Sequence, residues 1–233
     1  MGISTIALVT GANKGIGKEI ARQLGDLGMT VMVAGRDAGR VEAAAEELGA
    51  QPVVLDVTDE ESIAAAAKQI ERDHGRLDVL VNNAGILAEL NGASTEDFLH
   101  TYHTNVVGVV NVTNALLPLL RKGTDARIVN LSSELGSVAL LADPDSRQAG
   151  IPLFAYNSSK AALNAVTVMF ANAVREDGIK VNAISPGFCA TDMNNHQGVL
   201  TAAQGAELAV RFAILPADGP SGEFHGQEGP LPW

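Results

Sequence analysis

A tyrosine and a lysine four residues apart form the pair in this sequence that could move a proton. Tyr156 and Lys160 lie in a stretch that predicts a helix, so their side chains would share one face. A tyrosine is a poor acid or base at neutral pH, because its ordinary pKa is about 10. A neighbouring ammonium group favours the phenolate and would lower that pKa. A tyrosine tuned in this way can give a proton to a carbonyl oxygen while a hydride reaches the carbon.

Ser133 could assist the same reaction. It follows an apolar run at residues 127–131 that predicts a strand. Its hydroxyl could donate a hydrogen bond to the carbonyl oxygen and stabilise the charge that develops there. The competing interpretation is that Tyr156 and Lys160 only occupy a solvated helix face. The chain has two tyrosines, Tyr102 and Tyr156, and this small number limits coincidence.

A glycine-rich stretch at residues 10–17 reads Thr-Gly-Ala-Asn-Lys-Gly-Ile-Gly. It stands between an apolar run at 3–9, which predicts a buried strand, and an amphipathic helix predicted at 18–27. In that context glycines let the backbone approach a pyrophosphate, and the helix N-terminus directs free N–H groups at it. The spacing differs from Gly-x-Gly-x-x-Gly, and Glu19 stands where a P-loop needs Ser or Thr. The alternative is that these glycines only mark a turn.

Strands and helices are predicted to alternate along the chain. Predicted strands cover residues 3–9, 30–35, 52–55, 77–81, 127–131 and 179–184, with a short candidate at 223–225. Predicted helices cover residues 18–27, 41–48, 60–73, 95–121, 156–174 and 201–214. The strands are continuous apolar runs, which is typical of parallel sheets covered on both faces. We expect an α/β fold: one doubly wound domain over residues 1–233, with a mostly parallel seven-stranded sheet. Polar residues follow each strand, so the sequence predicts a ligand crevice at the strands' carboxyl ends.

The bulk composition excludes several classes of partner. The net charge of −11 argues against binding to nucleic acid or to an anionic membrane surface. We find no apolar run long enough for a bilayer and no signal peptide. A lone Cys189 excludes internal disulfides and fits a reducing compartment, so a cytoplasmic location is expected. No metal site is predicted, because Asp97, His100 and His103 are interpreted as a solvated helix face.

Taken together, these motifs resemble those of the short-chain dehydrogenase/reductase family. The matching pieces occur in family order from about residue 5 to residue 193 and comprise Thr10-Gly11-x-x-x-Gly15-x-Gly17, Asp56, Asn82-Asn83-Ala84-Gly85, Asn105, Ser133, Tyr156-x-x-x-Lys160 and Pro186-Gly187 before Thr191. Within the family, Asn13-Lys14 and Gly35-Arg36-Asp37 look most like carbonyl reductases, including the plant terpenoid and alkaloid group.

The resemblance implies a role for each matching residue. Tyr156 would be the general acid in reduction and the general base in oxidation. Lys160 would lower the pKa of Tyr156 and hold the nicotinamide ribose, Ser133 would orient the carbonyl, and Asn105 would hold a water connecting Lys160 to solvent. The residues implied to bind the cofactor are Gly11, Asn13, Lys14, Gly15, Ile16, Gly17, Arg36, Asp56, Val57, Asn83, Ala84, Gly85, Tyr156, Lys160, Pro186, Gly187 and Thr191.

The residues at the end of the second strand indicate which cofactor. An NAD site places an acid there, whereas an NADP site offers an arginine to the 2′-phosphate. Here Gly35 takes the acidic position and Arg36 follows it, with Lys14 as a second cation. A phosphate between these cations would make charge-assisted hydrogen bonds, so we predict NADP(H). Asp37 is the counter-argument, and we interpret it as a helix cap.

The expected activity is NADPH-dependent reduction of an apolar ketone or aldehyde, reversible as alcohol oxidation. A catalytically silent NADP-binding regulator on the same fold is the alternative. Substrate-site elements are expected at 134–155, 187–201 and 219–233, with a short lid and an open, weakly selective pocket. Its expected apolar lining is Leu87, Leu135, Phe154, Phe188, Met193 and Trp233. Residues 142–151 are an insertion of intermediate length, which leaves monomer and homodimer both open.

Overall fold

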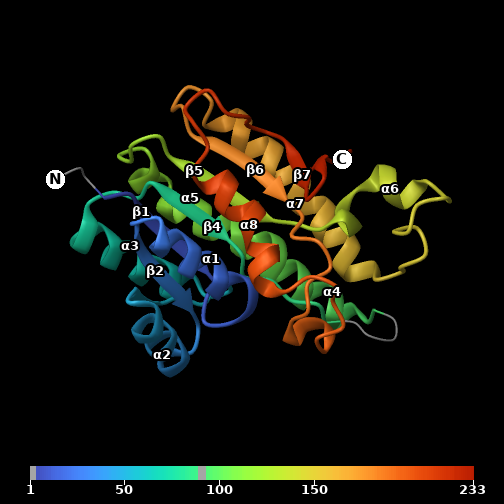
Figure 1. The fold of residues 1–233 in the computed structure, drawn as a ribbon, viewed down its shortest axis with the longest axis horizontal. Helices are drawn as coiled ribbons and strands as arrows, with labels where there is room; N and C mark the ends of the chain where they lie inside the picture. The colour runs from blue at the N-terminus through green and yellow to red at the C-terminus, as the bar shows by residue number, and fades with distance from the viewer. Residues whose placement is uncertain (1–3, 89–92) are drawn as a thin grey trace.

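The computed structural model describes residues 4–88 and 93–233, which form one sheet covered by helices on both faces (Figure 1). The sheet has eight strands in the order β3-β2-β1-β4-β5-β6-β7-β8. The strands are β1 Ile6–Thr10, β2 Thr30–Gly35, β3 Gln51–Val54, β4 Val79–Asn82, β5 Arg127–Leu131, β6 Lys180–Ile184, β7 Phe224–Gly226 and β8 Gly229–Pro230. The doubly wound α/β fold is therefore confirmed.

The predicted number of strands is wrong by one. Strands β1 to β7 are parallel to their neighbours, but β7 turns back at its end and pairs antiparallel with the two-residue strand β8. The turn at residues 227–228 leads into Gly229, the first residue of β8, whose φ is +133°. That conformation is easily adopted only by glycine, and a two-residue strand is too short to leave a periodic signal in the sequence.

The helices cover the two faces in two groups. The described helices are α1 Gly15–Asp26, α2 Ala38–Leu48, α3 Glu60–His74, α4 Thr95–Tyr102, α5 Gly108–Leu120, α6 Val138–Ala142, α7 Phe154–Ala173 and α8 Ala202–Ala213. Side chains of α1, α2 and α8 belong to one buried apolar cluster, and side chains of α3, α5 and α7 belong to the other. The result is three layers, with the sheet in the middle (Figure 1).

Successive strand residues point to opposite faces, which explains the continuous apolar runs. In β1, Leu8 packs into the cluster with α3 and α5, while its neighbour Val9 packs into the cluster with α1 and α8. Both side chains are fully buried. Burial on both faces removes the alternation that a half-exposed strand would show.

The order of the strands determines where the ligand crevice lies. The chain proceeds from β1 outward to β2 and β3, then returns so that β4 lies on the other side of β1. The helices α1, after β1, and α5, after β4, therefore lie on opposite faces of the sheet. This reversal opens a crevice beyond the carboxyl ends of β1 and β4. The glycine-rich residues 10–17 follow β1 directly and stand at that point.

Side-chain caps fix where several helices begin. Asp37 accepts a hydrogen bond from the Arg40 backbone N–H at 3.0 Å, so the interpretation of Asp37 as a helix cap is confirmed. Residue type also predicts caps at Asp59 and at Thr95. Asp59 does cap α3. The cap predicted at Thr95 is wrong by one residue, because Ser94 caps α4 in a reciprocal arrangement with Asp97.

The helix predicted at 95–121 is not continuous. Between α4 and α5 the chain forms one π-helical turn, His103–Val107. Such turns insert one extra residue into a helix and are frequent at functional sites. Asn105 lies in the middle of this turn, and apolar periodicity alone carries no signal for it.

Two segments that lie between the predicted helices and strands contain short regular pieces. Residues 136–152 include α6, whose first turn is capped by Ser137 through a 3.1 Å hydrogen bond from the Leu140 N–H. The Ser137 hydroxyl also donates to the Pro232 carbonyl at 2.7 Å, which ties this segment to the last strand region. Residues 192–194 form a 3-10 turn. Among the described residues, no helix is both long enough and apolar enough to cross a membrane.

Candidate active site

The glycine-rich turn brings two backbone segments together beyond β1 and β4. Gly11 has a φ of +62°, and a Cβ added there would lie 2.9 Å from the Ala84 Cα. A Cβ at Gly17 would overlap the Asn83 amide and would lie 2.7 Å from the Gly11 carbonyl oxygen. Because neither position has room for a side chain, these glycines are required by the fold of the turn and are more than punctuation.

Asn83 fastens this arrangement. Its Nδ2 donates hydrogen bonds to the carbonyl oxygens of Thr10 and Gly11, at 2.8 Å and 3.0 Å. The Thr10 hydroxyl accepts from the backbone N–H groups of Asn83 and Ala84. The predicted role of Asn83 as a cofactor contact is thus accompanied by a structural one, since its side chain joins the loop after β4 to the loop after β1.

A cleft of about 490 Å³ runs along these loops. Most residues predicted to bind the cofactor line it: Gly11, Asn13, Lys14, Gly15, Ile16, Gly17, Arg36, Asp56, Val57, Asn83, Ala84, Gly85 and Thr191. A cradle that any Cβ would fill, beside a helix N-terminus, fits a dinucleotide pyrophosphate. The helix in question, α1, begins at Gly15. The residues present therefore fit a nicotinamide cofactor.

Several residues that line the cleft were not predicted to bind the cofactor: Gly35, Leu55, Thr58, Ile86, Leu87, His100, Thr104, Asp192 and Met193. Most of them are sequence neighbours of predicted residues, so extension of each motif by one or two positions would have found them. Leu87 and Met193 were expected in the substrate pocket instead. Tyr156, Lys160, Pro186 and Gly187 lie outside this lining.

Tyr156 and Ser133 meet at the end of β5. A hydrogen bond joins their side chains, so both hydroxyl groups lie close together. Ser133 also accepts a 3.2 Å hydrogen bond from the Leu135 backbone N–H, which orients its hydroxyl. The pKa of the Tyr156 phenol is raised above its ordinary value of 10.0, because burial disfavours the phenolate, while the Ser133 hydrogen bond acts in the opposite direction.

This direction is opposite to the lowered pKa expected for Tyr156, and the expected effect of Lys160 on that pKa stays a prediction. The Lys160 Nζ donates a 2.8 Å hydrogen bond to the Leu131 carbonyl and lies 5.6 Å from the centre of the Tyr156 ring. Lys160 is only 5% exposed, and burial lowers its own pKa to about 8. Burial of the phenol is the largest cause of the raised pKa of Tyr156. Tyr156 is therefore protonated at neutral pH, as a proton donor must be, but burial makes it a weaker acid than an exposed tyrosine.

Asn105 holds the loop after β4 beside Lys160. Its Nδ2 donates to the Ile86 carbonyl at 2.9 Å and to the Ser159 hydroxyl at 3.1 Å, and its Oδ1 accepts from the Ile86 N–H at 2.8 Å. A Cβ at Gly85 would lie 3.3 Å from the Asn105 Oδ1 and 3.5 Å from the Lys160 Nζ. Gly85 thus lies between the two side chains, and the water-holding role of Asn105 stays a prediction.

Pro186 and Gly187 form the bend after β6. Gly187 has a φ of +80°, and a Cβ there would lie 2.8 Å from the Leu200 side chain. The Pro186 carbonyl accepts hydrogen bonds from the Cys189 thiol and from the Gln227 amide. This bend returns the chain to the cleft at Thr191, whose methyl group would lie 3.9 Å from a Cβ at Gly15.

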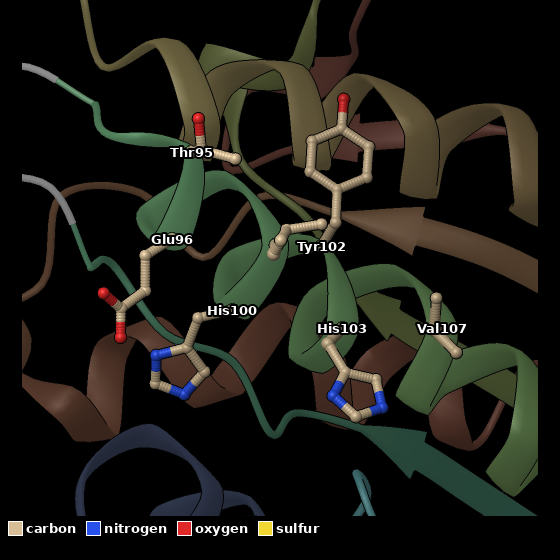
Figure 2. A pocket seen from close by; sticks show the side chains of 7 residues that line it. Thr95, Glu96, His100, Tyr102, His103 and Val107 are labelled. Carbon is tan, nitrogen blue, oxygen red and sulfur yellow. The ribbon is translucent and has the colours of Figure 1, made fainter.

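The helix face expected to carry Asp97, His100 and His103 contains one residue of the cleft, His100. Figure 2 shows His100 and His103 pointing to one side of the helix and Tyr102 to the other. His100 lines both the cofactor cleft and a separate, largely apolar pocket of about 710 Å³ on α4. His103 and Arg36 help to lower the pKa of Asp56, an effect smaller than those of burial, which raises it, and of hydrogen bonds from Thr58. Within the described residues, no group of three or more His, Cys, Asp or Glu side chains could hold a metal.

All six of the expected apolar pocket residues are partly or largely exposed. Phe154 is 62% and Phe188 55% exposed, and Trp233 stacks on Phe224 with ring centres 5.6 Å apart. Exposed aromatic rings beside the Tyr156 helix and the bend after β6 suit the mouth of an open site better than a closed pocket. The assignment of individual residues to substrate stays a prediction.

Comparison with known proteins agrees with this architecture. A family model described as short chain dehydrogenase matches residues 5–199. The chain is 38% identical to the short-chain dehydrogenase anuI of Penicillium roqueforti over 89% of this chain and 88% of that protein. It is 34% identical to salutaridine reductase of Papaver somniferum, over 94% of this chain and 93% of the reductase. An NADPH-bound carbonyl reductase structure from chicken fatty liver superposes with a TM-score of 0.87 at 30% identity, covering 100% of both chains.

The fold and its cleft define a nicotinamide-cofactor oxidoreductase of the doubly wound α/β class. The chain belongs to the short-chain dehydrogenase/reductase family, as its motifs suggested. The relatives include carbonyl reductases and plant reductases, in agreement with the resemblance drawn from residues 13–14 and 35–37.

Proposed function

We propose that this protein is an NADPH-dependent reductase of a ketone or aldehyde carbonyl, with Tyr156 as the general acid. The observation that carries the proposal is the hydrogen bond between Ser133 and Tyr156, next to Lys160 and to the loop that lines the cofactor cleft. A silent regulator would have no need for a buried lysine beside that pair, and burial of an ammonium group is costly.

In the proposed reaction the chain's residues act on one oxygen atom. The bound cofactor supplies a hydride to the carbonyl carbon. Ser133 donates a hydrogen bond to the carbonyl oxygen and polarises it. Tyr156, which is protonated at neutral pH, gives its hydroxyl proton to the same oxygen. Lys160 stabilises the phenolate that remains until a proton returns from solvent.

The proposed preference for NADPH rests on charge at the end of β2. Gly35 is buried and offers no acid to a ribose 2′-hydroxyl, whereas Arg36 and Lys14 both line the cleft. Asp37 is used as the cap of α2, which removes it as a competing ribose ligand. The resemblance to an NADPH-bound carbonyl reductase supports the same choice.

The test is consumption of NADPH with a panel of aromatic ketones, quinones, diketones and monoterpenoid ketones, followed by loss of absorbance. We expect turnover of at least one apolar carbonyl and slower turnover with NADH. Tight NADPH binding without turnover across the panel would favour the silent regulator. Binding of NADH tighter than that of NADPH would overturn the cofactor assignment alone.

A further inference from the structure

Lys14 already has an anionic partner. Its Nζ lies 2.7 Å from the Asp192 carboxylate, although the two residues are 178 positions apart in the sequence. Lys14 belongs to the glycine-rich loop, and Asp192 begins the 3-10 turn in the segment after β6. Both side chains line the cofactor cleft. The ion pair therefore joins the two rims of the cleft at its surface.

We propose that Asp192 competes with the cofactor's 2′-phosphate for Lys14, and so weakens binding of NADPH without affecting binding of NADH. The inference rests on the proposed function, in which Lys14 and Arg36 hold that phosphate. It concerns a residue that the sequence motifs left out. A lysine carries a single positive charge, so a phosphate that approaches it must displace or share the Asp192 carboxylate.

The segment that carries Asp192 is built to keep its shape when Lys14 leaves. The Thr191 N–H donates to the Asn194 Oδ1 at 3.1 Å, and the Asn194 amide donates to the Cys189 carbonyl at 2.8 Å. The His196 Nε2 lies 3.1 Å from the other Asp192 oxygen. Asp192 therefore keeps a partner after Lys14 moves, and Lys14 can return when the phosphate departs.

Arg36 differs from Lys14 in this respect. It is exposed and lines the same cleft, and in the described part of the chain no carboxylate lies within salt-bridge distance of it. Arg36 can thus meet the phosphate without first giving up a salt bridge, whereas Lys14 cannot. Arg36 and Lys14 therefore contribute unequally to binding of the 2′-phosphate. The contribution of Lys14 is the smaller one, because Asp192 competes for its charge.

The size of the effect follows from exposure. The Lys14 and Asp192 side chains are 59% and 57% exposed, so solvent screens their attraction. Removal of such a competitor is expected to tighten NADPH binding about two- to fivefold at low salt. The change should appear mainly as slower dissociation of the cofactor, because affinity changes within one site act chiefly on that rate.

The test measures dissociation constants and dissociation rates of NADPH and NADH from wild type, Asp192→Asn, Lys14→Met and the double variant, by cofactor fluorescence. Asp26→Asn is the matched control: it removes one carboxylate from an exposed ion pair, with Arg22 at 2.8 Å, at the other end of α1. We expect tighter NADPH binding in Asp192→Asn only, no change for NADH, and a smaller effect at about 0.5 M salt. In the Lys14→Met background the substitution should have no effect.

Different outcomes separate this inference from the proposed function. If NADPH binds better than NADH and Lys14→Met weakens that preference, but Asp192→Asn changes nothing or tightens both cofactors equally, the inference is wrong and the cofactor assignment stands. Persistence of the Asp192→Asn effect without Lys14 also overturns it. If wild type binds NADH as tightly as NADPH and Lys14→Met is silent, the proposed cofactor and the inference fail together.

Discussion

The cofactor cleft and the substrate side of this molecule are built by different means. Around β1 and β4 the positions are set by backbone in close contact, as at Gly11 and Gly17, where no Cβ fits. Beyond β5 and β6 they are set by side-chain hydrogen bonds and by irregular segments, such as Ser137 on the Pro232 carbonyl. Close backbone contact tolerates no added atom, whereas a surface of loops does. Close backbone packing therefore fixes the shape of the cofactor cleft, whereas the substrate side is free to vary.

The exposure of side chains also differs between the cofactor cleft and the substrate side. Ala12, in the glycine-rich turn, is fully buried, whereas Phe188 and Phe154 on the substrate side are more than half exposed. Side chains at an open mouth can be exchanged at little cost in stability, since surface substitutions usually change it by less than about 0.5 kcal/mol. Tyr156 stands between the two regions and serves both.

The largest expected effect comes from the residue that the two regions share. Tyr156→Phe removes the proton donor and is expected to lower kcat about 10²- to 10⁴-fold, with NADPH affinity changed less than about twofold. Stopped-flow measurement of NADPH oxidation and a fluorescence titration of cofactor give the two numbers. Tyr102→Phe, whose hydroxyl points away from the cleft side of α4, is the matched control (Figure 2). A variant that kept more than a tenth of the activity would remove Tyr156 from the mechanism.

The buried ammonium of Lys160 should make stability depend on pH. Its pKa is lowered from 10.5 to about 8, so between these values the folded protein binds fewer protons than the unfolded chain. Wild type should therefore gain stability relative to Lys160→Met as pH rises through this window, by on the order of 3 kcal/mol. Denaturant unfolding of both proteins at pH 7 to 10 measures the difference. The exposed Lys122→Met serves as control, and a difference independent of pH would contradict the burial of the charge.

The backbone contact in the cofactor region is tested by Gly17→Ala. The added methyl group meets Asn83 and the Gly11 carbonyl, so we expect a loss of about 1–3 kcal/mol in stability together with weaker NADPH binding. Thermal unfolding and cofactor titration follow the two effects. Gly25→Ala on the same helix is the control, because no heavy atom lies within 4 Å of its Cβ position. It should stabilise the protein slightly, as alanine is the better helix former. Equal behaviour of the two variants would contradict the close packing of the turn.

The smallest effect is expected on the substrate side. Ser137→Ala removes the cap of α6 and its hydrogen bond to Pro232, and should cost about 1 kcal/mol of stability. Because the change lies outside the cofactor cleft, KM for the carbonyl substrate should rise while KM for NADPH stays constant. Steady-state kinetics with each substrate varied in turn separate the two. A parallel rise in both constants would mean that the two regions are not independent.

The alternation of strands and helices was open to prediction, because continuous apolar runs leave a strong signal. The bounds of β2 and β5 were predicted to the residue, and the caps at Asp37 and Asp59 followed from residue type. The π-helical turn at Asn105 and the two-residue strand β8 were not predicted. Both depend on contacts with distant backbone, namely Ile86 and β7, which local patterns do not record.

The candidate site also has features that could be predicted from local sequence and features that could not. Motif spacing identified Ser133, Tyr156 and Lys160, and the structure brings the first two into hydrogen-bond contact. The sequence predicted a lowered pKa for Tyr156, and this direction is wrong. Desolvation raises the pKa, and it is known only once the surrounding residues are in place. Asp192 left no signal, since its partner Lys14 is remote in sequence.

Sequence alone determined the order of the elements, the glycine positions and the chemistry of the residues at the strand ends. These depend on residue type and on short-range periodicity, which the chain carries at every point. Tertiary structure decided the pKa shifts of Tyr156 and Lys160, the position of Asn105 and the pairing of Lys14 with Asp192. These depend on burial and on distances between remote segments, and both are defined only when the chain has folded.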